Sequence, residues 1–307
     1  MGFGQAAYDT TSMALLLSMF PSRTATTWSF VELTVALGYI SGAPFGGFLN
    51  EIEGFYFPFV ISGSILLVFT PLLVYLMSDS QLLSENMYTE DEGEVTSWKL
   101  LKMPPIVLVC ANLSSCFISM QLFETSMAVF LDKEFGWSSS YIGLVFLVSG
   151  AVYFVMTIFT GPLVDATNPR VLMIIGLLME GCAMMAVGPS FVFSFLSPKP
   201  WCVYLSMVLF GLGMPLITIS AGPDMIRTAT LRGYEKNMSL NGAVSGLVLA
   251  ATFLSGTVGA PIAGGLTAAF DFRHSSSYFA FFNFLLVIIS IVATASEAFM
   301  SRRIMHN

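Results

Sequence analysis

Long apolar runs, each separated from the next by a short polar or charged segment, occupy most of the chain from its first residues onward. Nine of these runs reach the length of about 20 residues that a helix needs to cross a bilayer. They cover roughly residues 2–20, 28–49, 55–77, 104–131, 140–163, 170–195, 201–224, 241–269 and 277–299. The pattern predicts an all-α polytopic membrane protein with nine spanning helices.

The composition agrees with this prediction and excludes several classes of protein. The 307 residues are 55% hydrophobic and 10% charged, with a mean hydropathy of +0.79, which is more apolar surface than a soluble domain of this size can bury. The sequence has no basic stripe for nucleic acid, no metal-ligand spacing, no nucleophile motif and no phosphate loop. We therefore expect no enzyme, cofactor, metal or nucleic-acid partner. The lipid bilayer is the expected surrounding, and the oligomeric state stays open.

The basic residues of the connecting segments indicate an orientation. Nine of the twelve lie on one side of the predicted helices: Arg23, Lys99, Lys102, Arg170, Arg227, Arg232, Lys236, Arg302 and Arg303. The other side has only Lys133, Lys199 and Arg273. Loops rich in lysine and arginine stay in the cytosol. The C-terminus is thus predicted to be cytosolic.

A glycine–proline cluster occurs twice, as GAPFGG at residues 42–47 and as GAPIAGG at residues 259–265. Glycines on one helix face let two backbones approach closely, and a proline within a span bends it. The residues concerned are Gly38, Gly42, Pro44, Gly46 and Gly47 in the first copy and Gly259, Pro261, Gly264 and Gly265 in the second. Plain helix packing explains any single glycine, but the duplication indicates an internal repeat.

The spans around the two clusters extend this repeat. Spans one to three match spans seven to nine, and three further spans precede the second copy. Equal repeats therefore predict twelve helices in two six-helix halves, with the first three helices lacking from this sequence. Residues 1–77 would be helices 4–6 of the first half, 78–103 an acidic cytosolic linker, and 104–307 the complete second half.

Two six-helix halves are the plan of a major facilitator superfamily transporter, and individual stretches resemble that family. SGAPFGGFL resembles the antiporter motif of the fifth helix, with Ala43 where a proline is usual. GPLVDATNPR, at residues 161–170, resembles the loop motif between helices 8 and 9. It keeps Gly161, Asp165 and Arg170, but Asn168-Pro169 replaces glycine-arginine. FPSRTATTWSFVELTVALGYISGAPFGGFL and YIGLVFLVSGAVYFVMTIFTGPLVD are similar to the vesicular amine transporter family, and most like its vesicular polyamine transporter branch.

Acidic residues inside the predicted spans are the candidate chemistry, because an ionised side chain near the bilayer centre costs about 3 kcal/mol or more. Asp9, Glu32 and Glu124 are read either as a cation or proton site or as carboxyls held between packed helices, and the resemblance implies acids at these places. Gln121 lies one turn before Glu124, and Tyr153 is a candidate for cation–π contact. Glu180 is interpreted as structural, whereas Asp224 and Glu297 lie at span ends where water is near.

The resulting expectation is a proton-coupled antiporter that exchanges an organic cation, such as a polyamine, for protons across a vesicular or other endomembrane. A carboxylate binds the cation and releases it on taking up a proton. The spans that read GLGMPLITISAG and GLVLAATFLSG lack the acids that monoamine transporters carry there. Two alternatives stay open: a membrane protein that does not transport, and a facilitator of another small solute.

Overall fold

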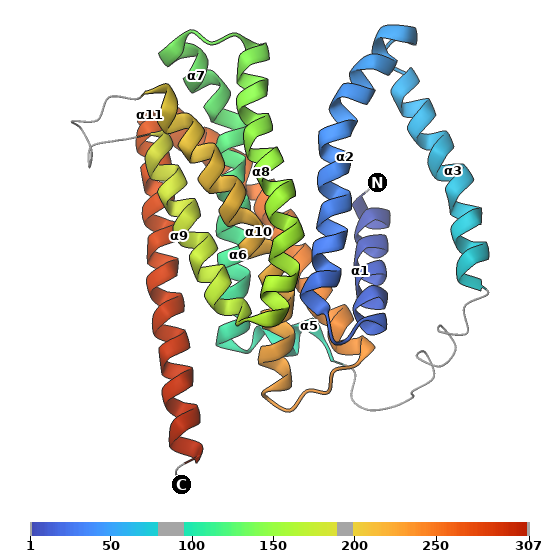
Figure 1. Ribbon diagram of the computed structural model, residues 1–307, viewed down its shortest axis with the longest axis vertical. Helices are drawn as coiled ribbons and strands as arrows, with labels where there is room; N and C mark the ends of the chain where they lie inside the picture. Colours follow the sequence, from blue (N-terminus) through green and yellow to red (C-terminus); the bar gives the residue numbers. More distant parts are fainter. Residues whose placement is uncertain (1, 79–94, 189–198, 306–307) are drawn as a thin grey trace. The chain divides into compact units, whose positions relative to one another are not determined.

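The computed structural model describes residues 2–78, 95–188 and 199–305, and its elements are helices (Figure 1). No strand occurs in these ranges. The elements in chain order are α1 (Gly2–Met19), α2 (Thr24–Glu53), α3 (Phe57–Ser78), α5 (Ser97–Leu101), α6 (Pro104–Leu122), the π-helical turn η1 (Phe123–Met127), α7 (Ala128–Phe135), α8 (Ser139–Ala166), α9 (Pro169–Val187), α10 (Pro200–Thr230) and α11 (Met238–Met305).

The helices lie at the positions of the apolar runs. In the described ranges, five helical segments are long and apolar enough to cross a bilayer, namely Pro104–Phe135, Tyr141–Ala166, Pro169–Val187, Pro200–Thr230 and Met238–Glu297. The first of these joins α6, η1 and α7, and the last contains two predicted spans. Together with α1, α2 and α3, the described part of the chain has nine helical segments, which confirms the predicted fold class.

Helix α11 is two helices joined at Asp271, whose φ of 64° and ψ of 161° are not helical. Contacts with α6 show that the chain turns back at this point. Thr267 is hydrogen-bonded to Ser126, whereas the later residue Asn283 is bonded to Ser115, which lies further back along α6. The predicted separation of the spans 241–269 and 277–299 is therefore confirmed.

The chain divides into two compact parts, residues 1–33 with 95–307 and residues 34–94. In the second part, α2 from Thr34 onward and helix α3 are apolar, with side chains such as Leu66, Leu67 and Val68 exposed. Contact with lipid chains removes such apolar side chains from water as well as burial in a protein core does. The first part contains α1, the first turns of α2 and the helices from α5 onward.

Helix α10 is the centre of the first part, because it packs against α6, α8, α9 and α11. Its closest approach is to α9, where Gly176 and Gly213 face each other. A Cβ placed on either glycine would lie 2.7 Å from the carbonyl oxygen of the other. No side chain larger than hydrogen fits between the two backbones, so glycine here fixes the spacing of the helices.

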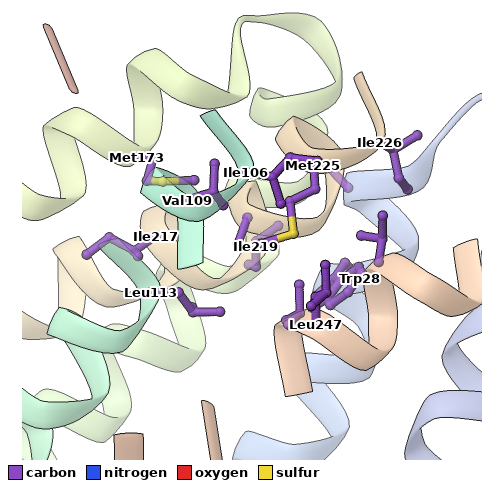
Figure 2. Close-up of a cluster of buried hydrophobic side chains, with 14 of the residues drawn as sticks. Trp28, Ile106, Val109, Leu113, Met173, Ile217, Ile219, Met225, Ile226 and Leu247 are labelled. Atoms are coloured by element: carbon purple, nitrogen blue, oxygen red, sulfur yellow. The ribbon is translucent and has the colours of Figure 1, made fainter. Parts of the chain in front are cut away.

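A buried apolar cluster fixes the first turns of α2 to the same helices. Trp28 is 2% exposed, and its indole ring lies against Gly222 of α10, where a Cβ would meet the ring at 2.4–2.9 Å. Figure 2 shows Trp28 with Met225, Ile226 and Leu247, beside a second group formed by α6, α9 and α10. Residues before Leu33 are therefore positioned by α10 and α11.

Candidate functional site

Glu32 and Tyr153 form the first of two polar pairs at the predicted positions. Helix α2 places Glu32 one turn beyond Trp28, and helix α8 places Tyr153 opposite it. The Tyr153 hydroxyl donates to Glu32 Oε2 over 2.7 Å, and the hydroxyl of Thr218 on α10 lies next to the phenol. Sequence reasoning named Glu32 and Tyr153 for separate reasons, and it missed Thr218, which was hidden in an apolar run.

Glu124 and Gln121 form the second pair, at an irregular place in the helix. The α-helix α6 ends at Leu122, and the next turn, η1, is π-helical and contains Glu124. Gln121 Nε2 donates to Glu124 Oε2 over 3.2 Å, and the Glu124 side chain is exposed. Single π-helical turns cost stability and occur frequently at functional sites, because they redirect a side chain.

The first glycine of the second glycine–proline cluster, Gly259, lies next to this pair. A Cβ on Gly259 would lie 3.1 Å from Ile118 Cα and 3.0 Å from Gln121 Cγ, so α11 approaches α6 closely where Gln121 begins. Pro261 lies exposed within α11. Gly264 and Gly265 have open space where a Cβ would be.

Other predicted residues belong to neither pair. Asp9 lies half-buried on α1. Gly38 has open space around its Cα. Gly42, Pro44, Gly46 and Gly47 fall in helix α2, but their surroundings, like the side chain of Gln5, lie outside the described features. The expected equivalence of Pro44 and Pro261 therefore stays a prediction.

The loop motif around Gly161 and Asp165 lies at the N-terminus of α2. Asp165 accepts hydrogen bonds from the backbone N–H groups of Ala25 and Thr26, both at 2.9 Å, and from the Thr26 hydroxyl at 2.5 Å. A Cβ on Gly161 would lie 2.9 Å from Thr26 Cα, so the glycine allows this approach. A carboxylate at a helix N-terminus satisfies free N–H groups and interacts favourably with the helix dipole.

Lys236 makes a second contact near Asp165. Its ammonium donates to the carbonyl oxygen of Pro21, in the turn between α1 and α2. Partial burial lowers the pKa of Lys236, and the nearby Asp165 carboxylate opposes that change. The last turn of α8 thus binds the N-terminus of α2, and the connection after α10 binds the turn that precedes α2.

Arg170, the last residue of the loop motif, lies in a buried cluster of charges. Its Nε donates to Asp224 Oδ2 over 3.0 Å, its Nη1 to Glu297 Oε2 over 2.5 Å, and its Nη2 to the Thr228 hydroxyl over 3.0 Å. The expectation that Asp224 meets water is wrong, because it is 2% exposed and paired with Arg170. Opposite charges at the same end of three spans were the signal for this cluster.

Glu180 is enclosed by the helices, as is a set of amide and hydroxyl groups. Its exposed fraction is 0%, and the Cys116 thiol and Ser119 hydroxyl of α6 lie close to it. Next to them, Asn283 of α11 accepts from Ser115 and donates to Ser119. Asn283 was missed, because a lone asparagine in an apolar run gives no sign of its partner.

The family model for the Major Facilitator Superfamily matches residues 1–234. The MFS-type transporter SLC18B1 of Homo sapiens is 30% identical over 277 residues, which are 89% of this chain and 58% of the relative. The Mus musculus protein of the same name is 32% identical over 270 residues, 86% of this chain and 56% of the relative. The vesicular acetylcholine transporter of Drosophila melanogaster is 23% identical over 299 residues, 93% and 48% of the two chains.

The chain therefore spans about half the length of these curated relatives. A solved structure of the E. coli fucose:proton symporter has a similar fold, with a TM-score of 0.58 at 12% identity over 92% of this chain and 72% of that chain. The relatives are membrane transporters related to vesicular amine carriers, not enzymes. The chain belongs to the Major Facilitator Superfamily.

Proposed function

We propose that the protein is a proton-coupled antiporter that moves a polyamine-like organic cation across a vesicular membrane. The proposal is supported by family membership and by the relatives, whose names include vesicular acetylcholine transporters and a human chromaffin granule amine transporter. The substrate is small, and the chain meets it within the bilayer. The observation that carries the proposal is the Glu124 carboxylate, exposed on a π-helical turn within a spanning segment.

Glu124 is the proposed cation site. An organic ammonium ion leaving water needs a fixed negative charge, and a carboxylate that later takes up a proton releases the ion. The Gln121 amide, which lies close to Gly259, donates from Nε2 to Glu124 Oε2 over 3.2 Å. The other carboxyl oxygen is left for the cation. A neutral amide orients the carboxylate without cancelling its charge.

Glu32 and Tyr153 are proposed to carry protons, with Asp9 as a further candidate acid. The Tyr153 phenol donates to Glu32 and lies next to the Thr218 hydroxyl, so a hydrogen bond between the two hydroxyls would complete a chain of exchangeable protons. A proton moves along such a chain without any large change in the protein. We therefore propose that Tyr153 carries protons and does not make the cation–π contact that the sequence suggests.

Asp165 and Lys236 are proposed to close one side of the transport path. Asp165, at the end of α8, binds the first residues of α2, and Lys236, after α10, binds the turn before them. In the proposed division, residues 104–307 are the second half, residues 1–77 belong to the first half and residues 78–103 are the linker. The excess of lysine and arginine on this side supports the proposal that it, and the C-terminus, face the cytosol.

The test is uptake of radiolabelled spermidine into proteoliposomes with an acidic interior. The 307-residue chain is reconstituted in parallel with any longer product of its transcript. We expect uptake that an ionophore collapsing the pH gradient stops, and that Glu124→Gln abolishes by removing the charge at nearly constant shape. Glu134→Gln is the matched control, since Glu134 lies on the same helical segment but pairs with Arg273 at the surface.

Three outcomes separate the alternatives. Uptake by the Glu124→Gln variant at the wild-type rate, with equal protein in the vesicles, would assign Glu124 to packing and leave Asp9 as the candidate cation site. Uptake that is independent of the pH gradient would show a facilitator. Absence of uptake in every preparation would refute the transport proposal.

A further inference from the structure

The buried carboxyl of Glu180 has no role in the site described so far. It lies in the middle of α9, which packs chiefly against α10 and α11, and its exposed fraction is 0%. Within the described part of the chain, neither of its oxygen atoms makes a hydrogen bond with favourable geometry, whereas the buried acid Asp224 is paired with an arginine. An unpaired carboxyl in such a place is stable only when it carries a proton.

The groups that face Glu180 are polar but uncharged. From α6, the Cys116 thiol and the Ser119 hydroxyl lie next to the carboxyl. From α11, Asn283 reaches Ser119 by donating to its oxygen over 3.3 Å. From α10, the backbone at Gly213 lies against that of Glu180, so no side chain enters there.

Two charged groups lie beyond these neighbours: Glu32, which is close enough to Cys116 to act on it, and Arg170, which is the cation on the same helix. Cys116 lies close enough to both Glu180 and Glu32 for their charges to act on its thiol. Glu32 itself accepts a hydrogen bond from Tyr153 on α8. Arg170 is ten residues away, about 15 Å along the helix axis, and is bound to Asp224 and Glu297. Among the residues that the structure describes, Glu180 thus has no cationic partner that would stabilise its negative charge.

We propose that Glu180 is a proton-binding site within the C-terminal helices, neutral in this arrangement and ionised at another stage of the transport cycle. The Ser119 oxygen already accepts from Asn283, so its own hydroxyl proton is free to turn toward a carboxylate. Cys116 supplies a second, weaker donor. A small movement of α6 relative to α9 would bring both donors to Glu180 and favour loss of its proton.

This inference rests on the proposed antiport and adds a coupling element to it. Ser119 and Glu124 lie five residues apart on the continuous segment α6–η1, so a movement of that segment on cation binding at Glu124 also moves the donors next to Glu180. Cation binding at one carboxyl and proton release at another are then linked through one helix. The number of protons released for each cation bound would be larger than Glu124 alone provides.

Infrared spectroscopy of the purified protein tests the protonation directly. We expect a carbonyl band of a protonated carboxylic acid at neutral pH that is lost in Glu180→Gln and kept in Glu134→Gln. Ser119→Ala should move the pH at which this band disappears upward, because the carboxylate loses a donor. A band of equal intensity in wild type and Glu180→Gln would overturn the proposal.

Proton release on spermidine binding, measured in weakly buffered detergent solution, tests the coupling. We expect Glu180→Gln to bind spermidine within about threefold of wild type while releasing fewer protons. Unchanged proton release would overturn the coupling role. If the wild-type protein binds no amine, the proposed substrate fails, but the infrared result still decides whether Glu180 carries a proton.

Discussion

Replacing Arg170 should destabilise the protein much more than replacing its exposed partner Glu297. The side chains of Arg170 and Asp224 are 8% and 3% exposed, so their ion pair is cut off from water. Removing one partner of a buried pair leaves an uncompensated charge and typically costs about 3–5 kcal/mol. We expect Arg170→Met to lower the free energy of unfolding by about that amount.

The second partner serves as an internal control. Glu297 is 39% exposed, and an exposed ion pair contributes about 0–1 kcal/mol, so Glu297→Gln should have little effect. The double variant Arg170→Met/Asp224→Leu removes both buried charges and should recover most of the loss, because an apolar pair fits a buried site about as well as an ion pair. Its stability should therefore exceed that of Arg170→Met alone.

Unfolding by sodium dodecyl sulfate in mixed micelles, followed by tryptophan fluorescence or circular dichroism, gives the free energies for this cycle. A loss below about 1 kcal/mol in Arg170→Met would refute the reasoning, because that value is typical of a solvent-exposed pair. A double variant less stable than Arg170→Met would show that the side chains matter by their shape and not by their charges.

Two further changes test the close approaches between helices. Gly259→Leu should cost about 1–3 kcal/mol by overpacking against Ile118 and Gln121, whereas Gly264→Leu, with open space at its Cβ, should stay within about 0.5 kcal/mol; equal losses would contradict the assigned contacts. Asp165→Ala should lose about 0.5–2 kcal/mol of capping at the start of α2 and make the turn before Ala25 more sensitive to protease, with Asp132→Ala at an exposed position as control; an unchanged cleavage rate would show that Asp165 does not stabilise the start of α2.

The fold was predictable because its main signal is local. Each apolar run is long enough to determine its own helix, and Asp271 divides the last two runs as the hydropathy pattern indicates. The pairing of side chains was less accessible. Glu32 and Tyr153 are 121 residues apart, and the position of Thr218 beside them depends on how three helices rotate about their axes.

The polar residues that the sequence misjudged show the same limit. Asp224 was expected to meet water because it lies near the end of a run, yet α10 continues to Thr230 and Arg170 covers the carboxylate. The π-helical turn at Glu124 could not be foreseen either, since residues Phe123–Met127 have no composition that distinguishes them from an α-helix. Sequence identified which acids to consider, and packing decided what each of them contacts.

The facing glycines of α9 and α10 also bear on natural variation in this protein. Gly176→Ala and Gly213→Ala add a single methyl group, which substitution scales class among the mildest changes. Each added carbon would nevertheless fall 2.7 Å from a backbone oxygen that cannot rotate away, so the two helices would have to separate along their length. A variant allele with alanine at either position should therefore be scored as damaging, ahead of many charge-changing alleles in the exposed loops.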